Sequence, residues 1–407
     1  MSTLKADSVT ASSGVNTALS LTGKGTGKVA LGDAALTVPD TDGSANQYLR
    51  TTGEAALEFA TLPAAGLTGF RNLIINGDMA ISQRGTVAGI TGGGYGGPDR
   101  FMTYFSALGT WTVSQDASVP TAQGFASSLK VECTTADASP AASDLAIIKT
   151  GFEGQFLQQI KKGTANAEAM VLSFWVRSYK TGTHVVEVCD TDNPRAVSHA
   201  YTIDAQDTWQ KVEWAIPADV TGAFDNDNAL SLLVQWGLGA GTNWTSGTLQ
   251  ETWATKVTAN RFTGQVNVGD STNGTFYITG VQLEVGSSAT DFEHVPYDYQ
   301  LRRCERYYQT YGMGFRAFGI DASTIDSQFA FRIPMRSSPS VTLLDTTPTF
   351  TELGVAGRTG TSSSITTSAQ GPDGTGLVRV DGFSSVGASS VCIGYQSTPM
   401  FGFSAEL

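Results

Sequence analysis

One stretch of the chain changes its hydrophobic period part-way along. Over residues 276–285 apolar and polar side chains alternate, which is the period of a β-strand with one buried face. The alternation predicts one face with Tyr277, Thr279, Val281, Leu283 and Val285, and an opposite face with Phe276, Ile278, Gln282 and Glu284. We therefore predict a strand over this stretch.

Beyond residue 296 the period becomes helical. Tyr297, Leu301, Cys304 and Tyr308 recur at spacings of four, three and four. A helix this short is marginal alone in water, because helices below about 12–15 residues rarely hold without tertiary contacts. We predict that residues 297–311 form a linker helix that docks on the rest of the chain, as the hinge between two β-domains.

Further alternating segments lie upstream, separated by turns rich in Gly, Asp, Asn, Pro and Thr. They predict strands at residues 128–132, 169–177, 184–188, 209–216 and 230–236. The stretch 72–85 is predicted to form a strand followed by a polar turn. So many short strands favour a β-sandwich or a jelly roll as the central domain, over residues 67–296.

Residues 312–407 contain a second set of short alternating segments. Phe329, Phe331 and Ile333 alternate, and Pro334 is expected to end their strand at a sheet edge. Further strands are predicted at residues 340–344, 377–380 and 391–395, with a Ser/Thr/Gly-rich stretch at 357–375 as a separator. We predict a C-terminal β-domain with a sandwich-like architecture.

Residues 1–66 have a different character, with no Trp or Cys and with apolar residues in twos and threes between glycines. Such a segment buries too little apolar surface to fold alone, so it is either disordered or completed by other copies of itself. Turns at residues 42–43 and 52–53, beside strand-like segments at 47–50 and 57–59, favour the second alternative. Residues 64–66 are the predicted linker.

Composition supports a mostly-β chain of more than one domain. The 407 residues exceed what one compact core usually holds, and charged residues make up only 15%, against about 25% in an average globular chain. The 46 glycines and the many Thr, Ser and Ala residues favour strands and turns over helices. The net charge of −12, without a Lys/Arg-rich tract, disfavours nucleic-acid binding.

Targeting and cysteine patterns add two expectations. The apolar runs are shorter than the roughly 20 residues needed to span a bilayer, and the N-terminal segment lacks the apolar core of a secretory signal, so we expect synthesis and assembly in a cytoplasm. The cysteines lie far apart without a CxxC pair. We expect reduced, mostly buried thiols, and neither a metal site nor another cofactor. The cysteines are Cys133, Cys189, Cys304 and Cys392.

The sequence predicts no catalytic site. It contains no HExxH or GxSxG, and the glycine-rich stretch 91–97 lacks the Lys and Ser/Thr of a phosphate-binding loop. Paired carboxylates stay open as an enzymatic alternative, because glycoside hydrolysis uses two Asp or Glu residues about 5–10 Å apart. With 37 acidic residues, chance neighbours are expected. The candidates are Asp219, Asp225 and Asp227 near one loop, and Glu251 and Asp270 near another. For residues 225–228 a polar loop is the first reading and calcium binding the second.

The tryptophans divide into two groups. Trp244 and Trp253 lie in a polar, loop-like stretch, and we predict that they bind a ligand, because aromatic faces stack on sugar rings. Trp175, Trp209 and Trp236 alternate with apolar strand residues and are predicted to lie in the core.

Several phrases resemble those of bacteriophage fibre proteins, and they occur in the same order. They are NLIINGDM…SQRG, LSFWVRS, WQKVEWAIPAD and FYITGVQLEVG, followed by the helix RCERYYQ and by FRIPMRSSPSVTLLD. The element DGSANQYLRTTGEAALEF resembles one found in trimeric phage fibre shafts. The resemblance implies an intertwined trimeric shaft in residues 1–66 and a central jelly roll similar to carbohydrate-binding modules.

The same resemblance implies a function and partners. The chain would be a structural virion fibre, first of all a tail fibre, that attaches to the bacterial host surface through glycans or another receptor. It would be a homotrimer in the virion and would bind a tail, neck or capsid protein through residues 1–66, with no nucleic acid and no membrane insertion. A head or neck fibre that decorates the capsid, and a fibre with polysaccharide depolymerase activity, are the alternatives.

The resemblance also raises the question of calcium. Jelly-roll carbohydrate modules often hold a structural calcium partly through an Asp in the last strand. The matching residues 278–281 here read Ile-Thr-Gly-Val, without a carboxylate. Asp78, in the turn of the first predicted strand, does not make a site by itself, so we expect no metal.

Overall fold

The computed structural model describes residues 30–31, 36–37, 47–51, 56–61, 70–312, 316–344, 349–353, 359–361, 364–370, 375–381, 387–388, 390–394 and 399–407. The chain divides into two compact units, Met1–Thr68 and Gly69–Leu407. In the first unit, two antiparallel hairpins pair β1 (Ala30–Leu31) with β2 (Leu36–Thr37) and β3 (Gln47–Thr51) with β4 (Leu57–Thr61). β3 and β4 lie where strands are predicted. The predicted turns at 42–43 and 52–53 and the linker at 64–66 lie outside the described residues, and the trimeric shaft stays a prediction.

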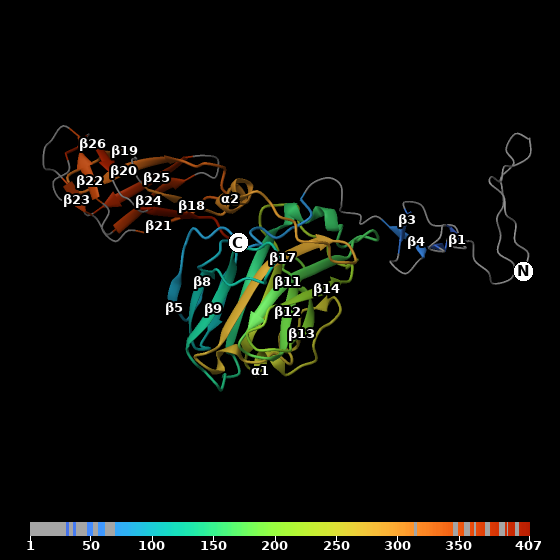
Figure 1. Cartoon of the computed structure of the whole chain (residues 1–407). Helices are drawn as coiled ribbons and strands as arrows, with labels where there is room; N and C mark the ends of the chain where they lie inside the picture. The colour runs from blue at the N-terminus through green and yellow to red at the C-terminus, as the bar shows by residue number, and fades with distance from the viewer. Residues whose placement is uncertain are drawn as a thin grey trace, which may run out of the picture. The chain divides into compact units, whose positions relative to one another are not determined.

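The second unit contains a β-sandwich of two antiparallel sheets, whose strands run side by side in Figure 1. The seven-stranded sheet has the order β16-β13-β12-β15-β10-β7-β6, and the six-stranded sheet has the order β14-β11-β17-β9-β8-β5. The first comprises β6 (Gly93–Tyr95), β7 (Met102–Ser106), β10 (Leu145–Glu153), β12 (Gly182–Asp190), β13 (Arg195–Ile203), β15 (Leu230–Ala240) and β16 (Ala254–Thr255). The second comprises β5 (Val87–Ile90), β8 (Thr110–Asp116), β9 (Ser128–Thr135), β11 (Met170–Ser178), β14 (Gln210–Ile216) and β17 (Thr275–Val285). The prediction of a mostly-β fold is confirmed.

Short helical turns lie between the strands of the sandwich. They are η1 (Gly154–Phe156), η2 (Gln158–Ile160), α1 (Thr242–Thr245), η3 (Thr258–Asn260) and η4 (Val268–Asp270). In the part of the chain that the structure describes, no helix is long and apolar enough to cross a membrane. All four cysteines are free and buried, as expected from their spacing.

The described stretch 72–85 contains no strand, contrary to the prediction. Asparagine side chains bond its backbone instead. Asn72 Oδ1 accepts from the amides of Ile74 (2.9 Å) and Leu283 (3.1 Å), and Asn76 Oδ1 accepts from the amide of Ile81 (2.9 Å). These local bonds satisfy backbone groups that a strand would pair with its neighbour, so the apolar residues of this stretch are buried without a ladder.

Both sheets bury their inner faces in one core. From β11 the inner residues are Met170, Leu172, Phe174 and Val176, all part of this core. Trp236, from β15 in the opposite sheet, is fully buried and packs edge-to-face against Phe174 at a centroid distance of 5.7 Å. The core assignment of Trp236 is confirmed.

β17 carries a β-bulge that the alternation pattern does not reveal. In its pairing with β11, Thr279 lies opposite Trp175 and Gln282 lies opposite Ser173, so the register shifts between them. Gly280 has a φ of +60°, a conformation that glycine adopts without a steric penalty. The predicted faces of this strand are therefore wrong beyond the bulge. The core residues from β17 are Phe276, Ile278, Val281 and Leu283.

The C-terminal part of the second unit forms two further sheets around a separate core. The three-stranded sheet has the order β18-β27-β21, and the seven-stranded sheet has the order β23-β22-β26-β19-β20-β25-β24. The strands are β18 (Tyr308–Tyr311), β19 (Arg316–Gly319), β20 (Ile325–Ala330), β21 (Ser340–Leu343), β22 (Thr349–Glu352), β23 (Thr359–Thr361), β24 (Ser364–Gln370), β25 (Thr375–Asp381), β26 (Val391–Gly394) and β27 (Phe401–Ser404). β21, β25 and β26 lie where strands are predicted. The predicted strand through Ile333 ends earlier, at Ala330, and the stretch 357–375 contains β23 and β24 rather than only a separator.

The helix α2 (Tyr297–Glu305) is shorter than the predicted segment 297–311, because Tyr308 already begins β18. Cys304 is fully buried, whereas the side chain of Tyr297 is exposed, so the predicted apolar stripe is correct only in part. The helix docks as expected from its length: Tyr299 stacks on Phe70 with a centroid distance of 4.5 Å.

Candidate ligand-binding site

A cavity of about 270 Å³ lies on the outer face of the six-stranded sheet, and we call it the Trp175 pocket. Strands β11, β14 and β17 form its floor, and two loops, around residues 122–125 and 291–294, form its walls. The pocket is lined by Ala122, Gln123, Phe125, Ser173, Trp175, Lys211, Gly280, Asp291, Phe292 and His294.

Trp175 faces this pocket because of the alternation within β11. Its neighbours Phe174 and Val176 point into the core, so the indole of Trp175 points to the opposite face, where it is half-buried. The predicted core position of Trp175 is therefore wrong. Trp209 is also only half-buried, with its ring 6.1 Å from that of Tyr277. The run of apolar residues in β11 conceals that Trp175 lies on the same face as Ser173 and Arg177.

The bulge at Gly280 shapes one wall of the Trp175 pocket. A Cβ atom at this position would lie 2.5 Å from Cζ of Phe125, so the ring of Phe125 occupies the space of a side chain. The rings of Phe125, Phe292 and His294 pack on one another with centroid distances of 5.0 to 5.5 Å. The bulge therefore fixes an aromatic cluster beside Trp175.

Polar side chains complete the Trp175 pocket. Gln123, Lys211 and Asp291 are exposed, and Ser173 is buried. Lys211 Nζ also pairs with Glu213 at 2.7 Å, on the exposed surface of β14. Aromatic faces beside hydrogen-bond donors and acceptors suit a ligand that has both an apolar face and hydroxyl groups.

The structure places Trp244 and Trp253 elsewhere, in two different clusters. Trp244 Nε1 donates to the carbonyl of Ser143 (3.2 Å), and its ring packs on a small apolar cluster beside the seven-stranded sheet. Trp253 Nε1 donates to the carbonyl of Pro217 (2.8 Å), and its ring packs against the main core. Both rings are half-buried, with their N–H groups already used. Their ligand role stays a prediction.

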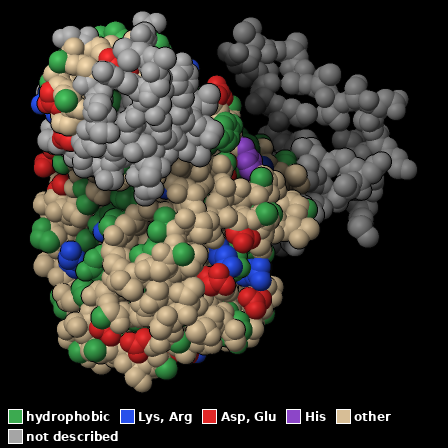
Figure 2. All heavy atoms as spheres, turned by 90° about the vertical axis from the view of Figure 1, so that its left-hand side faces the viewer, with side chains coloured by type: hydrophobic (Ala, Val, Ile, Leu, Met, Phe, Trp, Pro, Cys, Tyr) green, Lys and Arg blue, Asp and Glu red, His purple; other side chains and the backbone are tan. Residues whose placement is uncertain are grey.

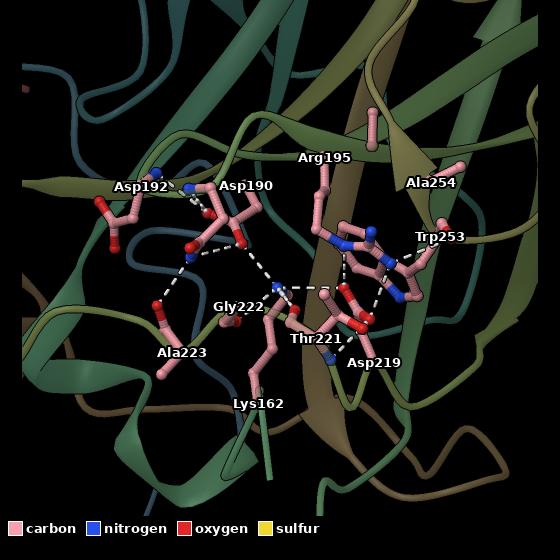
Figure 3. Close-up of polar contacts among 12 residues, drawn as sticks. Lys162, Asp190, Asp192, Arg195, Asp219, Thr221, Gly222, Ala223, Trp253 and Ala254 are labelled. Carbon is pink, nitrogen blue, oxygen red and sulfur yellow. Dashed lines mark hydrogen bonds and ion pairs between the residues drawn. The ribbon is translucent and has the colours of Figure 1, made fainter.

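Trp253 lies beside a buried ion network, shown in Figure 3. Lys162 Nζ lies 2.6 Å from Asp190 Oδ2 and 3.1 Å from Asp219 Oδ2, and the three side chains are at most 4% exposed. Arg195 donates to both oxygens of Asp219, at 2.8 and 2.9 Å. Burial by itself raises the pKa of Asp219, but the bonds from Arg195 and Lys162 outweigh it and hold the pKa below its usual value. This network clamps loops together and leaves Asp219 ionised.

The contacts of three other candidate acidic residues are local or involve other partners. Asp227 accepts from the amide of Ala229 (2.9 Å) within its own exposed loop, and Asp270 pairs with Lys180. The amide of Asp225 donates to Asp192 (3.0 Å). Among the residues described, no three His, Cys, Asp or Glu side chains come together as metal ligands.

Asp78, the residue left from the implied calcium site, lies next to Thr279 of β17. The Thr279 hydroxyl donates to the carbonyl of Asp78 (3.5 Å), so it uses the backbone and not the carboxylate. Burial raises the pKa of Asp78, although the backbone amide of Ala80 and the charge of His294 oppose it. Among the residues described, Asp78 belongs to no group of three or more His, Cys, Asp or Glu side chains that could hold a metal ion.

Sequence reasoning missed most of the Trp175 pocket. The parity of β11 is one signal that could have found it, because Ser173 and Arg177 share a face with Trp175 and mark that face as accessible. Gly280 inside an apolar strand is a second, since an interior glycine often marks a bulge. The aromatic residues of the two loops carry no such signal.

Comparisons with known proteins find similar solved structures but no matching sequence. No family model and no curated protein sequence matches the chain. Three similar solved structures are the enzymatically active domain of tailspike protein 4 of bacteriophage CBA120, the family 11 carbohydrate-binding module of Clostridium thermocellum in complex with a β-1,3-1,4-mixed-linked tetrasaccharide, and the CBM22-1 xylan-binding domain of Paenibacillus barcinonensis Xyn10C.

The similarity to these structures is low. The tailspike domain is 13% identical with a TM-score of 0.28, and the match covers 53% of this chain and 21% of that chain. The family 11 module is 9% identical with a TM-score of 0.25, over 48% of this chain and 91% of that chain. The xylan-binding domain is 12% identical with a TM-score of 0.23, over 50% and 94%. These values assign neither a family nor a ligand to the chain.

Proposed function

We propose that the chain is a structural fibre of a bacteriophage virion, first of all a tail fibre, which attaches the particle to glycans on the bacterial host surface. The proposal that the chain binds glycans rests on the Trp175 pocket. There an accessible indole and the Phe125 cluster lie beside polar side chains on the outer face of a sheet. The proposal that the chain is a virion fibre rests on the sequence phrases that resemble those of phage fibre proteins.

Multivalency supplies the mechanism. Three copies on one stalk, and several stalks on a particle, raise the overall affinity by orders of magnitude without strengthening any single contact. A weak site of about 270 Å³ is therefore sufficient for attachment. The surface fits this role: on the face shown in Figure 2, acidic and basic side chains are few and scattered, and uncharged groups predominate.

The first experiment measures binding of the purified protein to host cells and its ability to block adsorption of the parent phage. Saturable binding and blocking, together with a mass of about three chains by light scattering, are the expected results. Failure of a trimeric protein to bind would favour a head or neck fibre, and labelled virions viewed by electron microscopy would then locate it. A monomer in solution would contradict the fibre architecture.

The second experiment assigns the site. Trp175→Ala is expected to abolish cell binding in a protein that stays folded, because the indole provides the largest flat surface of the pocket. Trp244→Ala and Trp253→Ala test the prediction that Trp244 and Trp253 bind the ligand. Loss of binding in either of these, with binding intact in Trp175→Ala, would move the site to the polar loop.

We further propose that the chain is not an enzyme. The support is that Asp219 is engaged by Lys162 and Arg195, Asp270 by Lys180, and Asp227 by a backbone amide of its own loop. Incubation with host polysaccharide and a reducing-end assay tests this. New reducing ends would establish the depolymerase alternative.

A further inference from the structure

A second cavity, of about 310 Å³, lies between the segment at residues 70–75, the turns η1 and η2, and the helix α2. We call it the α2 pocket. The residues that matter in it are Phe70, Phe156, Tyr299, Arg303 and Arg306. None of them contributes to the Trp175 pocket.

Three aromatic rings of the α2 pocket are exposed to an extent that is unusual for their size. The exposed fractions are 48% for Phe70, 46% for Phe156 and 40% for Tyr299. Phe70 and Tyr299 stack with their planes 14° apart and their ring centroids 4.5 Å apart. Exposed aromatic groups that line a cavity mark a binding surface more often than isolated exposed residues do.

The two arginines of the pocket differ in their partners. The guanidinium of Arg306 is held by Glu153 through two hydrogen bonds of 2.7 Å. Arg303 forms no ion pair or hydrogen bond with any of the residues that the structure describes, and its Nη1 atom is buried. The carboxylate of Glu293, which is near Arg303, accepts instead from the amide of Asn72 at 2.8 Å.

An unpaired, partly buried guanidinium has an energetic cost. Burial lowers the pKa of Arg303, because the charged form loses hydration, and the charges of Tyr299 and Glu293 oppose this only in part. The ring of Phe70, 5.8 Å away, provides only a weak cation–π contact. An anionic group that entered the pocket would supply the missing partner through the two parallel bonds that guanidinium forms with a carboxylate.

We propose that the α2 pocket binds a sugar unit that carries a carboxylate, such as a uronic acid. Its carboxylate pairs with Arg303, and the apolar face of its ring packs on the aromatic surface of Phe70, Tyr299 and Phe156. The proposal shares its ligand class with the proposed glycan-binding function, but it uses a separate cavity. The two proposals therefore succeed or fail independently.

The test uses isothermal titration calorimetry on the full chain with sodium D-glucuronate, sodium N-acetylneuraminate and D-glucuronamide, the neutral amide of the first sugar. At least one of the two acids is expected to bind, with an affinity that falls as salt is added, and the amide is expected to bind much more weakly. Arg303→Gln is expected to weaken binding roughly 10- to 100-fold, since a hydrogen bond to a charged group contributes about 1.5–3 kcal/mol. Arg303→Lys, which keeps the charge but not the planar fork, should lose less.

Controls separate this site from the Trp175 pocket and from general anion binding. Trp175→Ala should leave glucuronate binding unchanged, and inorganic phosphate, which lacks the sugar ring, should bind more weakly than glucuronate. The proposal is overturned if neither acid binds the wild-type chain, if acid and amide bind equally, or if Arg303→Gln binds as the wild type does. It is overturned as well if Arg303→Gln changes the oligomeric state, because another copy of the chain would then be the occupant.

Discussion

Glu153 and Arg306 lie 153 residues apart in the sequence and form an ion pair with two hydrogen bonds of 2.7 Å. Glu153 ends β10 and is fully buried, and Arg306 follows the last residue of α2. Burial by itself raises the pKa of Glu153, but the bonds from Arg306 and Tyr307 outweigh it and lower the pKa below the usual value. The pair therefore fastens the helix to the sandwich with a charged carboxylate.

Glu153→Gln is expected to lower the free energy of unfolding by roughly 2–4 kcal/mol, because it leaves Arg306 and Tyr307 without their anionic partner. Urea denaturation followed by fluorescence measures the change. Glu213→Gln is the control: Glu213 pairs with Lys211 on the exposed surface, and its loss should cost less than about 1 kcal/mol. Equal effects of the two substitutions would contradict the role of Glu153.

Lys162→Met should be one of the most destabilising changes in the sandwich. It leaves the carboxylates of Asp190 and Asp219 buried without the cation between them, which typically costs about 3–5 kcal/mol. Thermal unfolding compares it with Lys161→Met, a neighbouring change that removes only the exposed pair with Glu168. A melting temperature of Lys162→Met close to that of Lys161→Met would show that the network is not a clamp.

Stability should fall in mild acid because of His184. Burial lowers the pKa of His184 from 6.5 to about 4, so the unfolded chain takes up this proton at a higher pH than the folded chain does. The contribution of neutral His184 to the free energy of unfolding is fully present above pH 6.5 and is lost as the pH falls toward 4. Its magnitude is roughly 3 kcal/mol.

Melting temperatures of the wild type and His184→Phe between pH 7 and pH 4 measure this contribution. The substitution keeps an aromatic ring next to Tyr201 and Phe276 but removes the titrating group, so the acid slope should become shallower. His294→Gln, at an exposed position, serves as the control and should keep the wild-type slope. Identical slopes in the wild type and His184→Phe would rule out His184 as the cause.

Gly280→Ala should damage the Trp175 pocket as well as the stability. The added Cβ atom would meet the ring of Phe125, and the alanine would have to keep the positive φ of Gly280. Together these two effects should lower the free energy of unfolding by about 2–4 kcal/mol. Gly85→Ala measures the cost of the positive φ alone, because Gly85 has a φ of +63° and open space around it. We expect this change to lower the free energy of unfolding by about 1–2 kcal/mol. Urea denaturation gives both numbers. The prediction fails if the two costs are equal.

Strands that lie between strong turn signals could be predicted from the sequence, and the sites could not. β12 and β15 were found because their apolar residues are frequent and lie between strong turn signals. Trp175 could not be placed from the apolar pattern, because apolar residues flank it along β11 although it shares a face with Ser173 and Arg177. The partner of Arg306 could not be predicted, since no local pattern connects residues so far apart in the chain. The same holds for Arg100, which pairs with Glu406.

The bulge at Gly280 also bears on how this chain should be compared with others. It is in effect one extra residue in β17, because two residues of that strand oppose one residue of β11. A relative with a regular strand would have one residue fewer here, and an alignment without a gap would match its core residues to surface residues of this chain. Placing the gap at Gly280 keeps Ile278 and Val281 both aligned with core positions.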